Sequence, residues 1–334
     1  MSTTDRFRWG IIAPGRIAHT FAEALAGIDD AVLTAVASRD PVRGAEFARA
    51  YSTEDHSVRV CPDYDSLIDE PDIDGVYIAN PHRFHADCVR RCLEAGKPVL
   101  CEKPLTVTTA GAESLFELAE DRGVFLMEAV WSRFLPVWDQ VRDWVRQGAV
   151  GEIHSVHSDF CFRLPFKSNG RHWDINQAGG VTLDMGIYAI SLSNFLFGRG
   201  PDRVQASVLK GETGVDIRTA ALLDYGHAVS AFTSSFIARR DNTMRIEGNA
   251  GHIVIDGPFW GSDRATLTRH DAEPDVADRP RRINGFEYQI EAAMADIRAG
   301  RLQNARIPWA DTLATARVID WILEDGGVDY PFLQ

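Results

Sequence analysis

The sequence lacks a long hydrophobic run, because no stretch approaches the about 20 consecutive apolar residues that a membrane-spanning helix needs. Its start, Met1 to Arg8, is polar and has no apolar signal-peptide core. Basic residues are in deficit, since 35 lysines and arginines face 48 acidic residues and leave a net charge of −13. Nucleic acids and anionic membranes both need a basic surface, so the charge argues against either partner.

Cysteines are also few. The five in the chain are scattered, and Cys88 and Cys92 lie four residues apart on one face of a predicted helix. An odd number of dispersed thiols suits small buried side chains better than disulfides or a metal site. We therefore expect no metal and a reducing, cytoplasmic location.

The first third of the 334 residues alternates short apolar runs with amphipathic segments. This alternation, with short connections, predicts an α/β fold with a parallel doubly wound sheet of Rossmann type. Right-handed crossovers place all strand ends on one side, so the motifs that follow strands share one rim. Strands are predicted at 7–12, 31–37, 75–79, 98–101 and 124–128, and helices at 17–26, 41–51, 82–95 and 108–122.

The remainder of the chain changes character. Turns such as Tyr225-Gly226 separate short alternating strands and predict an antiparallel meander. The acidic, proline-flanked segment 271–280 is expected to be an exposed loop. Two domains follow: a Rossmann domain over 1–128, and an α+β domain with a large, mostly antiparallel open sheet over 129–334. In the second domain, helices are predicted at 132–147, about 178–197, 287–299 and 309–323, and strands at 153–162 and between 203 and 268.

The turn after the first strand carries a dinucleotide-binding signal. Residues 10–18 end a strand and open a helix, and Gly15 and Ala18 match two positions of the G-x-G-x-x-G/A fingerprint. Ala13 replaces the first glycine, and Pro14 has no N–H to donate. Gly15 would let the backbone approach a pyrophosphate, which the amino end of the helix attracts. A glycine-bearing turn without a ligand is the alternative.

The end of the second strand bears on the choice of cofactor. NAD-preferring sites place an acidic residue there, on the ribose 2′-hydroxyl. Here the place holds Ser38 and Arg39, and Asp40 comes late. Ser38 can donate to a 2′-phosphate and Arg39 can pair with it, so the sequence favours NADP over NAD. The alternative is a solvated Arg39, with Asp40 serving the ribose.

Glu102-Lys103-Pro104 directly follows the apolar strand at 98–101. Ligands bind where strands end in open parallel sheets, and the proton affinity of a lysine in such surroundings can be tuned. An ordinary surface ion pair at a turn closed by Pro104 is the alternative.

The segment 179–188 is the other region that is rich in candidate catalytic residues. If it is helical, Asp184 and Tyr188 are neighbours on one face and can present an acid–base group beside an orienting carboxylate. A buried tyrosine hydroxyl bonded to Asp184 in a purely structural role is the alternative.

Two more clusters invite a functional interpretation. His82 and His85 follow the strand at 75–79, but three-residue histidine spacing without a third ligand is weak evidence for a metal, and capping or cofactor contact is favoured. Polar and aromatic residues suited to a polyol or aromatic substrate, or equally to packing, are Trp131, Arg133, Arg171, His172 and Trp173.

These segments, in this order, resemble the glucose–fructose oxidoreductase, inositol dehydrogenase and rhizopine-catabolism (Gfo/Idh/MocA) family. The resemblance covers essentially the whole chain, and the E-K-P motif after this dinucleotide fold is its most specific part. It implies a Rossmann domain followed by a mostly antiparallel α/β domain that usually oligomerises through its open sheet face. The supporting segments are 9–18, 74–81, 102–104 and 179–188.

Carried over residue by residue, Lys103 matches the family's catalytic lysine and Asp184 the aspartate of its D-x-G-x-H motif. The final histidine of that motif is Tyr188 here. This tyrosine and the segment 127–134 resemble the branch with dimeric dihydrodiol dehydrogenase, glucose–fructose oxidoreductase and NADP-linked pentose dehydrogenase, which disfavours an inositol-type activity. The expected cofactor contacts are Ala13, Pro14, Gly15, Arg16, Ile17, Ser38, Arg39, Asn80, Pro81, His85, Glu102 and Lys103.

The sequence thus predicts an oxidoreductase that transfers hydride between the nicotinamide of NADP or NAD and a secondary hydroxyl or carbonyl of a sugar, polyol or dihydrodiol. In oxidation, Tyr188 accepts the hydroxyl proton, Lys103 polarises the oxygen and Asp184 orients the pair. Two alternatives stay open: a non-catalytic dinucleotide sensor on the same fold, and a metal-dependent hydrolase that uses His82 and His85. A homodimer or homotetramer is expected.

Overall fold

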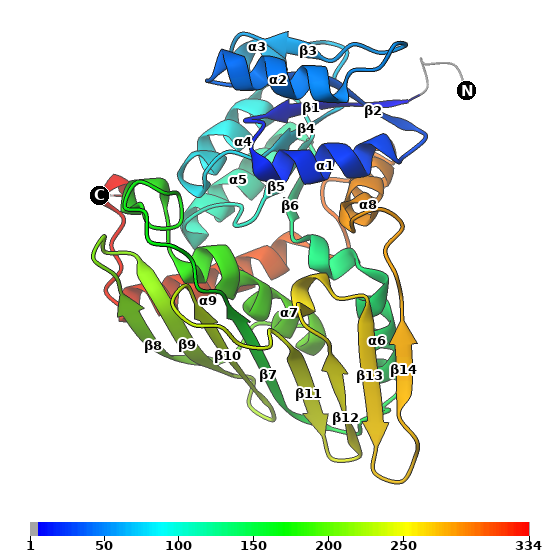
Figure 1. Ribbon diagram of the computed structural model, residues 1–334, viewed down its shortest axis with the longest axis vertical. Helices are drawn as coiled ribbons and strands as arrows, with labels where there is room; N and C mark the ends of the chain where they lie inside the picture. Colours follow the sequence, from blue (N-terminus) through cyan, green and yellow to red (C-terminus); the bar gives the residue numbers. More distant parts are fainter. Residues whose placement is uncertain (1–5, 334) are drawn as a thin grey trace. The chain divides into compact units, whose positions relative to one another are not determined.

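Figure 1 shows the computed structural model of the chain, which describes residues 6–333. The first five residues, on which the expected lack of a signal peptide partly rests, lie outside that range. The described chain forms two compact units. Unit 1 comprises the chain up to Thr106, Ala110–Trp131 and Arg282–Trp309, and unit 2 comprises Val107–Thr109, Ser132–Arg281 and the chain from Ala310 onward. A functional boundary at residue 128 stays a prediction.

Unit 1 is built on a six-stranded sheet with strand order β3-β2-β1-β4-β5-β6, in which every neighbouring pair is parallel. This is the strand order of a doubly wound fold, as predicted. Strands such as β1 are almost wholly buried, because a parallel sheet has helices on both faces. The strands are β1 (Phe7–Ile12), β2 (Ala31–Ala37), β3 (Arg59–Cys61), β4 (Gly75–Ile78), β5 (Val99–Glu102) and β6 (Leu126–Ala129).

Three helices of unit 1 begin within one residue of their predicted starts at 17, 41 and 108, whereas the helix predicted from residue 82 begins at His85, after a 3-10 turn at His82–Phe84. Helix α2 has Pro41 in its first turn, and the Asp40 carboxylate caps its free N–H groups. Helix α8, from near the end of the chain, packs against α1 and completes the unit (Figure 1). The helices are α1 (Arg16–Ala26), α2 (Pro41–Tyr51), α3 (Tyr64–Ile68), α4 (His85–Glu94), α5 (Thr109–Arg122) and α8 (Phe286–Arg298).

Unit 2 contains an eight-stranded sheet with strand order β14-β13-β12-β11-β7-β10-β9-β8. Its pairs are antiparallel except for β7 with β10, so the predicted mostly antiparallel sheet is confirmed. The expected loop 271–280 is wrong in part, because β14 pairs with β13 there. The strands are β7 (Ile153–Cys161), β8 (Arg203–Lys210), β9 (Asp216–Asp224), β10 (Val229–Ser235), β11 (Met244–Gly248), β12 (Gly251–Ile255), β13 (Arg264–Arg269) and β14 (Asp275–Asp278).

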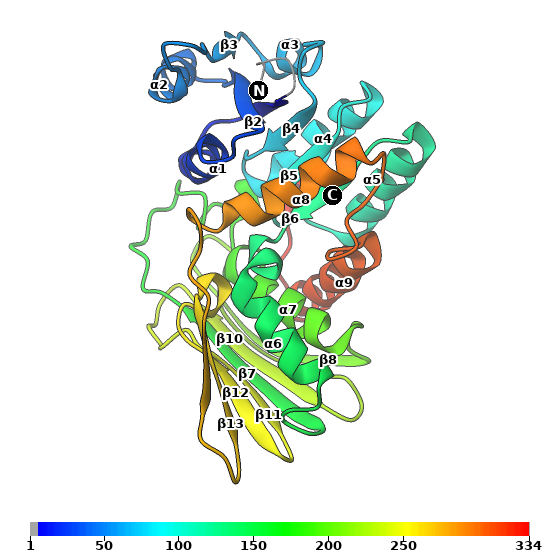
Figure 2. The same cartoon turned by 90° about the vertical axis from the view of Figure 1, so that its right-hand side faces the viewer.

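Helices α6 (Pro136–Arg146), α7 (Ile187–Phe197) and α9 (Trp309–Asp325) complete unit 2, and α6 and α7 lie over one face of its sheet (Figure 2). Helix α7 is apolar on all sides, as expected of a helix in a core. The helical stretch Ile175–Phe197 is long and apolar enough to cross a membrane, although 83% of its most apolar window is buried in the structure. The predicted single helix at about 178–197 instead begins with a π-helical turn, Thr182–Gly186.

Candidate active site

The turn between β1 and α1 leaves backbone N–H groups accessible to an anion. Ala13 adopts φ 61°, a left-handed conformation that costs a non-glycine residue about 1 kcal/mol. A side chain at Gly15 would meet only the Ala13 carbonyl oxygen, at 3.9 Å, so space is open there. No side chain caps the N–H groups at the start of α1, where Arg16 and Ile17 are exposed. Free N–H groups beside open space suit a pyrophosphate.

The three residues after β2 differ in their burial and in their hydrogen bonds. Ser38 is buried, and its hydroxyl accepts the N–H of Asp40 at 3.2 Å. Asp40 accepts the N–H groups of Val42 and Arg43 at 3.1 and 3.2 Å, so its carboxylate is committed to capping α2 rather than to a ribose. Arg39 is exposed and therefore remains the charged group at this strand end.

A pocket of about 260 Å³ lies beside Arg39, lined also by Tyr64, Asn80, Phe84 and Cys88. The Arg39 guanidinium lies 5.1 Å from the centre of the Phe84 ring. Asn80 is buried, and its Oδ1 has no hydrogen-bond partner. A pocket with flat walls and an unpaired buried acceptor can hold a planar ring that carries N–H groups, and the adenine of a dinucleotide fits that description.

The loop after β5 is buried rather than exposed. Glu102 and Lys103 are 7% and 9% exposed, which argues against an ordinary surface ion pair. The Tyr77 hydroxyl donates to Glu102 at 2.6 Å, and the Leu105 N–H donates to the Glu128 carboxylate at 2.8 Å. Lys103 therefore lies on a fixed loop at the rim where parallel strands end.

His85 connects two of these loops. Its Nδ1 lies 2.7 Å from the Pro104 carbonyl oxygen and its Nε2 lies 2.7 Å from that of Asn80. The ring is fully buried, so it holds the loop that contains Asn80 and Pro81 against the E-K-P loop. Because both nitrogens face carbonyl oxygens, the ring is poorly placed to share a metal with His82. Among residues 6–333, no cluster of three or more potential metal ligands is found.

In unit 2, Asp184 lies in the π-helical turn and Tyr188 in the first turn of α7. Asp184 is paired with Arg171, at 3.2 Å, and with His172, at 3.5 Å. The sequence singled out His172 as a residue suited to a substrate, but no local pattern in it indicates the contact with Asp184. Tyr188 is 7% exposed. π-Helical turns occur frequently at functional sites.

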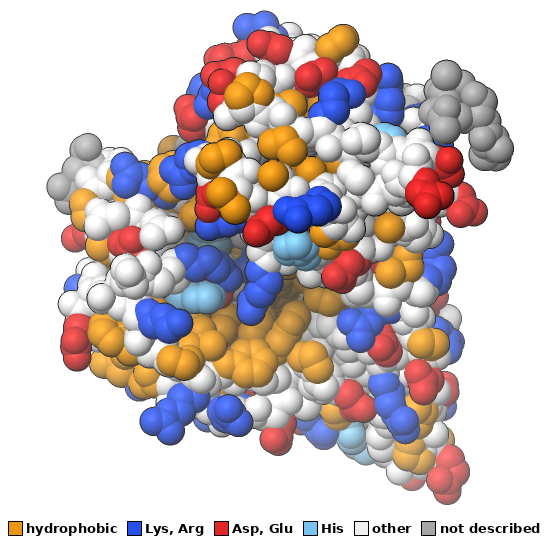
Figure 3. Space-filling view, turned by 45° about the horizontal axis from the view of Figure 1, so that its top comes forward, with side chains coloured by type: hydrophobic (Ala, Val, Ile, Leu, Met, Phe, Trp, Pro, Cys, Tyr) orange, Lys and Arg blue, Asp and Glu red, His pale blue; other side chains and the backbone are white. Residues whose placement is uncertain are grey.

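An aromatic wall, which we define as Phe160, Phe162 and Trp260, lies beside Tyr188. Phe160 and Trp260 stack with ring centres 3.4 Å apart, and Tyr188 lies 5.7 Å from Phe160 and 6.5 Å from Trp260. Phe162 is 38% exposed. Figure 3 shows hydrophobic side chains gathered on one face of the molecule, with Lys, Arg and His side chains beside them.

The predicted substrate residues differ in their settings. Arg133 is fully buried and donates to Ser191 at 3.0 Å and to Asp311 at 2.6 Å, which argues against direct contact with a substrate. Trp173 is buried against Phe236, with ring centres 5.3 Å apart. Two other predicted substrate residues are more accessible: Arg171 is exposed beside Asp184, and Trp131 in unit 1 is half-buried.

The strand order of unit 1, the open turn at Gly15 and the pocket at Arg39 together define a dinucleotide-binding protein. The chain belongs to the Gfo/Idh/MocA oxidoreductase family. The NAD-binding Rossmann-fold model of that family matches residues 7–130, and the C-terminal domain model matches residues 138–254. These matches confirm the predicted family and fold.

Similar proteins cover nearly the whole chain. It is 32% identical to trans-1,2-dihydrobenzene-1,2-diol dehydrogenase of Mus musculus over 97% of this chain and 98% of that protein. It is 30% identical to D-xylose 1-dehydrogenase (NADP(+)) of Hypocrea jecorina, over 98% of this chain and 93% of that protein.

Two solved structures are also similar. The 3-ketoreductase KijD10 of Actinomadura kijaniata, with NADP and TDP-benzene, has a TM-score of 0.84 at 26% identity and covers 96% of this chain and 97% of its own. Aldose-aldose oxidoreductase of Caulobacter crescentus, with glycerol, has a TM-score of 0.85 at 26% identity, over 96% of this chain and 98% of its own. The chain is therefore an NAD(P)-dependent oxidoreductase, as predicted.

Proposed function

We propose that the protein transfers hydride between the nicotinamide of NADP and a secondary alcohol or ketone on a ring-shaped substrate, either a cyclic sugar or a trans-dihydrodiol. The observation that carries the proposal is the placement of Lys103, a buried cation on a fixed loop, at the end of β5 in a dinucleotide-binding sheet. A cation there can polarise a substrate oxygen as its carbon gains or loses hydride.

Each proposed residue has one role. In oxidation, the deprotonated Tyr188 phenolate oxygen accepts the substrate hydroxyl proton while the carbinol carbon gives up its hydride to the dinucleotide. Lys103 stabilises the negative charge on the oxygen atoms involved, and Asp184 orients Tyr188 with the help of its partners Arg171 and His172. The bound dinucleotide supplies the hydride acceptor, and the protein supplies orientation and electrostatics.

The relatives support this assignment. Their names include a dihydrodiol dehydrogenase, a D-xylose dehydrogenase and a 3-ketoreductase. The solved structures of KijD10 also include variants in which one lysine or one tyrosine is replaced. Those are the residue types that we propose for proton transfer here.

The aromatic wall supports a ring-shaped substrate. Trp260, stacked on the buried Phe160 and beside Tyr188, is partly exposed and offers a flat apolar surface. A flat or puckered ring can lie on such a surface with its hydroxyls turned to polar groups. An open-chain polyol would gain less from this contact. We also propose that residues 1–128 hold the cofactor and residues 129–334 the substrate.

NADP is the cofactor that we favour. Arg39 is exposed at the end of β2, and Asp40, the residue that could have served the ribose hydroxyls, caps α2 instead. A 2′-phosphate would find a cation there, whereas the ribose hydroxyls of NAD would find no free carboxylate on this strand end.

A substrate screen tests the proposal. The purified protein is incubated with NADP or NAD and with cyclic sugars, open-chain polyols and trans-dihydrodiols, and the absorbance of the reduced nicotinamide is followed. We expect turnover with NADP and ring substrates, and Lys103→Met as the control should lower it about 10²- to 10⁴-fold. Tight NADPH binding without turnover of any substrate would instead support a dinucleotide sensor.

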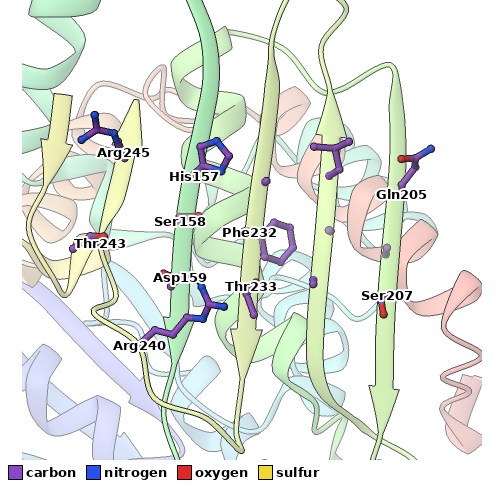
Figure 4. Close-up of a pocket in the computed structure, with 15 residues that line it drawn as sticks. His157, Ser158, Asp159, Gln205, Ser207, Phe232, Thr233, Arg240, Thr243 and Arg245 are labelled. Carbon is purple, nitrogen blue, oxygen red and sulfur yellow. Dashed lines mark hydrogen bonds and ion pairs between the residues drawn. The ribbon is translucent and has the colours of Figure 1, made fainter. Parts of the chain in front are cut away.

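We further propose that the protein is a homo-oligomer that pairs through the face of the sheet in unit 2 that lies opposite α6 and α7. A cavity of about 580 Å³ lies across strands of that sheet, and Figure 4 shows residues that line it, among them His157, Thr233 and Ser207, on neighbouring strands. Small side chains such as Ser207, Ala220 and Ala231 line it and leave room for close approach. Light scattering after gel filtration should give at least a dimer mass, and Ala220→Glu should lower it, whereas a wild-type monomer would contradict this proposal.

A cytoplasmic location is also proposed. All five cysteines are free and buried in the structure, as expected of a chain that folds in a reducing compartment. Detection of the protein in a secreted or membrane fraction of its source cells would contradict this.

A further inference from the structure

Unit 2 contains a buried carboxylate that the proposed reaction does not use. Asp216, the first residue of β9, is fully buried beside the start of the π-helical turn. Its Oδ2 accepts the backbone N–H of Thr182 at 2.7 Å and the Thr219 hydroxyl at 3.2 Å. Its Oδ1 has no hydrogen-bond partner. Because burial of a half-satisfied carboxylate destabilises the fold, its presence here points to a role beyond packing.

Gly180 fits closely against this carboxylate, and Gly179 fits against the backbone of Arg171 and His172. Gly180 has φ +127°, and a Cβ atom there would overlap Asp216 Oδ1. The Gly180 N–H donates to the His172 carbonyl oxygen at 3.0 Å, and the Tyr330 hydroxyl donates to the Gly179 carbonyl oxygen at 2.8 Å. The backbone that enters the π-helical turn is therefore held by β9, by the preceding loop and by the end of the chain.

The contact continues into the turn. Thr182 opens the π-helical turn, and its hydroxyl lies 2.8 Å from that of Thr219 on β9. Asp184 and Tyr188 follow on the same continuous helical backbone. Because β9 holds both the N–H and the hydroxyl of Thr182, the strand sets where the following residues lie.

We propose that Asp216 is a positioning residue, whose hydrogen bond to the Thr182 N–H fixes the π-helical turn so that Asp184 and Tyr188 meet the substrate in one orientation. The inference rests on the proposed function, since it concerns residues assigned there to proton transfer. Burial raises the pKa of Asp216, and the hydrogen bonds from Thr182 and Thr219 lower it. The oxygen that accepts the Thr182 N–H is present in either protonation state.

Two substitutions at Asp216 distinguish the role of its hydrogen-bond acceptor oxygen from that of its side-chain volume. Asp216→Ala removes the acceptor and should lower kcat about tenfold to a hundredfold, because small misplacements of reacting groups have effects of that size. Its KM for NADPH should not change, since the cofactor-binding residues belong to unit 1. Asp216→Asn keeps an amide oxygen for the Thr182 N–H and should retain a kcat close to that of the wild type.

A second pair of variants tests the same contact by changing Gly180 instead of Asp216. Gly180→Ala places a methyl group where Asp216 Oδ1 lies and should reproduce the loss of kcat. Gly214→Ala is its matched control, because Gly214 also has a positive φ, of +87°, but a Cβ atom there meets nothing within 4 Å. If Asp216→Ala does not fold, the comparison of Gly180→Ala with Gly214→Ala tests the proposal instead.

Hydrogen exchange gives a readout that does not depend on activity. In Asp216→Ala and Gly180→Ala, amides within 180–188 should exchange faster, while those of β1, β4 and β5 should not change. Wild-type kcat in folded Asp216→Ala, an equal loss of kcat in Asp216→Asn, or unchanged exchange within 180–188 would overturn the inference. If the wild-type protein turns over no substrate, the proposed function fails, yet the exchange data still test whether Asp216 holds the turn.

Discussion

The two units position their candidate residues in different ways. In unit 1, Lys103 and Arg39 follow β5 and β2 directly, and parallel topology alone places them on one rim. In unit 2, Asp184 and Tyr188 depend on a π-helical turn that is held by Asp216, on a strand later in the chain. Local sequence is therefore enough to find the first kind of site, whereas the second requires long-range contacts. The following predictions probe this difference, from the largest expected effect to the smallest.

Lys103→Met should have the largest effect. Removing a cation that acts in proton transfer should lower kcat about 10²- to 10⁴-fold, while NADP affinity should change little. Steady-state kinetics and fluorescence titration with NADPH measure the two quantities. Lys210→Met is the control, because that exposed lysine belongs to unit 2 and donates to the Gly327 carbonyl oxygen. Equal losses of turnover and of NADP affinity would show that Lys103 merely holds the cofactor.

Tyr188→Phe should follow, with a loss of kcat of about 10²-fold, because the ring packing stays while the proton acceptor is lost. The KM for substrate should change little, since the Phe160 and Trp260 contacts remain. The comparison uses the best substrate from the screen. Turnover equal to that of the wild type would show that Tyr188 has a purely structural role, which is consistent with its burial.

Arg39→Ala should weaken NADP about tenfold to a hundredfold, in line with the about 1.5–3 kcal/mol of a hydrogen bond to a charged group. NAD affinity should stay the same. The control is Arg43→Ala, whose exposed side chain pairs with Asp40 at 3.5 Å. Fluorescence titrations with the reduced forms measure both affinities, and an unchanged preference between them would refute the choice of NADP.

The smallest effect concerns stability at alkaline pH. Burial raises the pKa of Cys88 to about 11 from its usual 9, and burial also raises that of Cys101. As the pH rises, the unfolded chain therefore loses these protons before the folded protein does. The contribution of the buried thiols to the free energy of unfolding is fully present below pH 9 and is lost as the pH rises toward 11. Each pKa unit corresponds to about 1.4 kcal/mol, so the Cys88 contribution is about 1–3 kcal/mol.

Urea denaturation at pH 8 and pH 10.5 measures this loss. Cys88→Ala should lose less stability between the two values than the wild type does. An identical pH dependence in the wild type and in Cys88→Ala would contradict the prediction.

The sequence predicts much of unit 1, because its signals are local. Periodicity located the strands, and the turn at Gly15 and the E-K-P loop lie where the motifs place them. Burial was harder to foresee: Arg133 looked like a ligand-binding cation, but its guanidinium is fully buried and bonded to Ser191 and Asp311. A pattern of residue types does not reveal which way a side chain points.

The sequence predicts unit 2 less completely. The segment 178–197 has a helical pattern, yet a single π-helical turn of five residues is too short to change that pattern, so the sequence does not reveal it. The aromatic wall joins Phe160 on β7 to Trp260, which is far from it in the chain, and no local motif links them. The fit of Gly180 to Asp216 is likewise visible only once β9 is in place.

The central claim is that Lys103 and Tyr188 act in one proton-transfer step, and a double-mutant cycle tests it most directly. The kcat of Lys103→Met, Tyr188→Phe and the double variant are compared on one ring substrate with NADP. If the two groups act together, the double variant should be about as slow as the slower single variant, because loss of either residue already disables the step. Multiplication of the two losses would show that the residues act independently and would contradict the account.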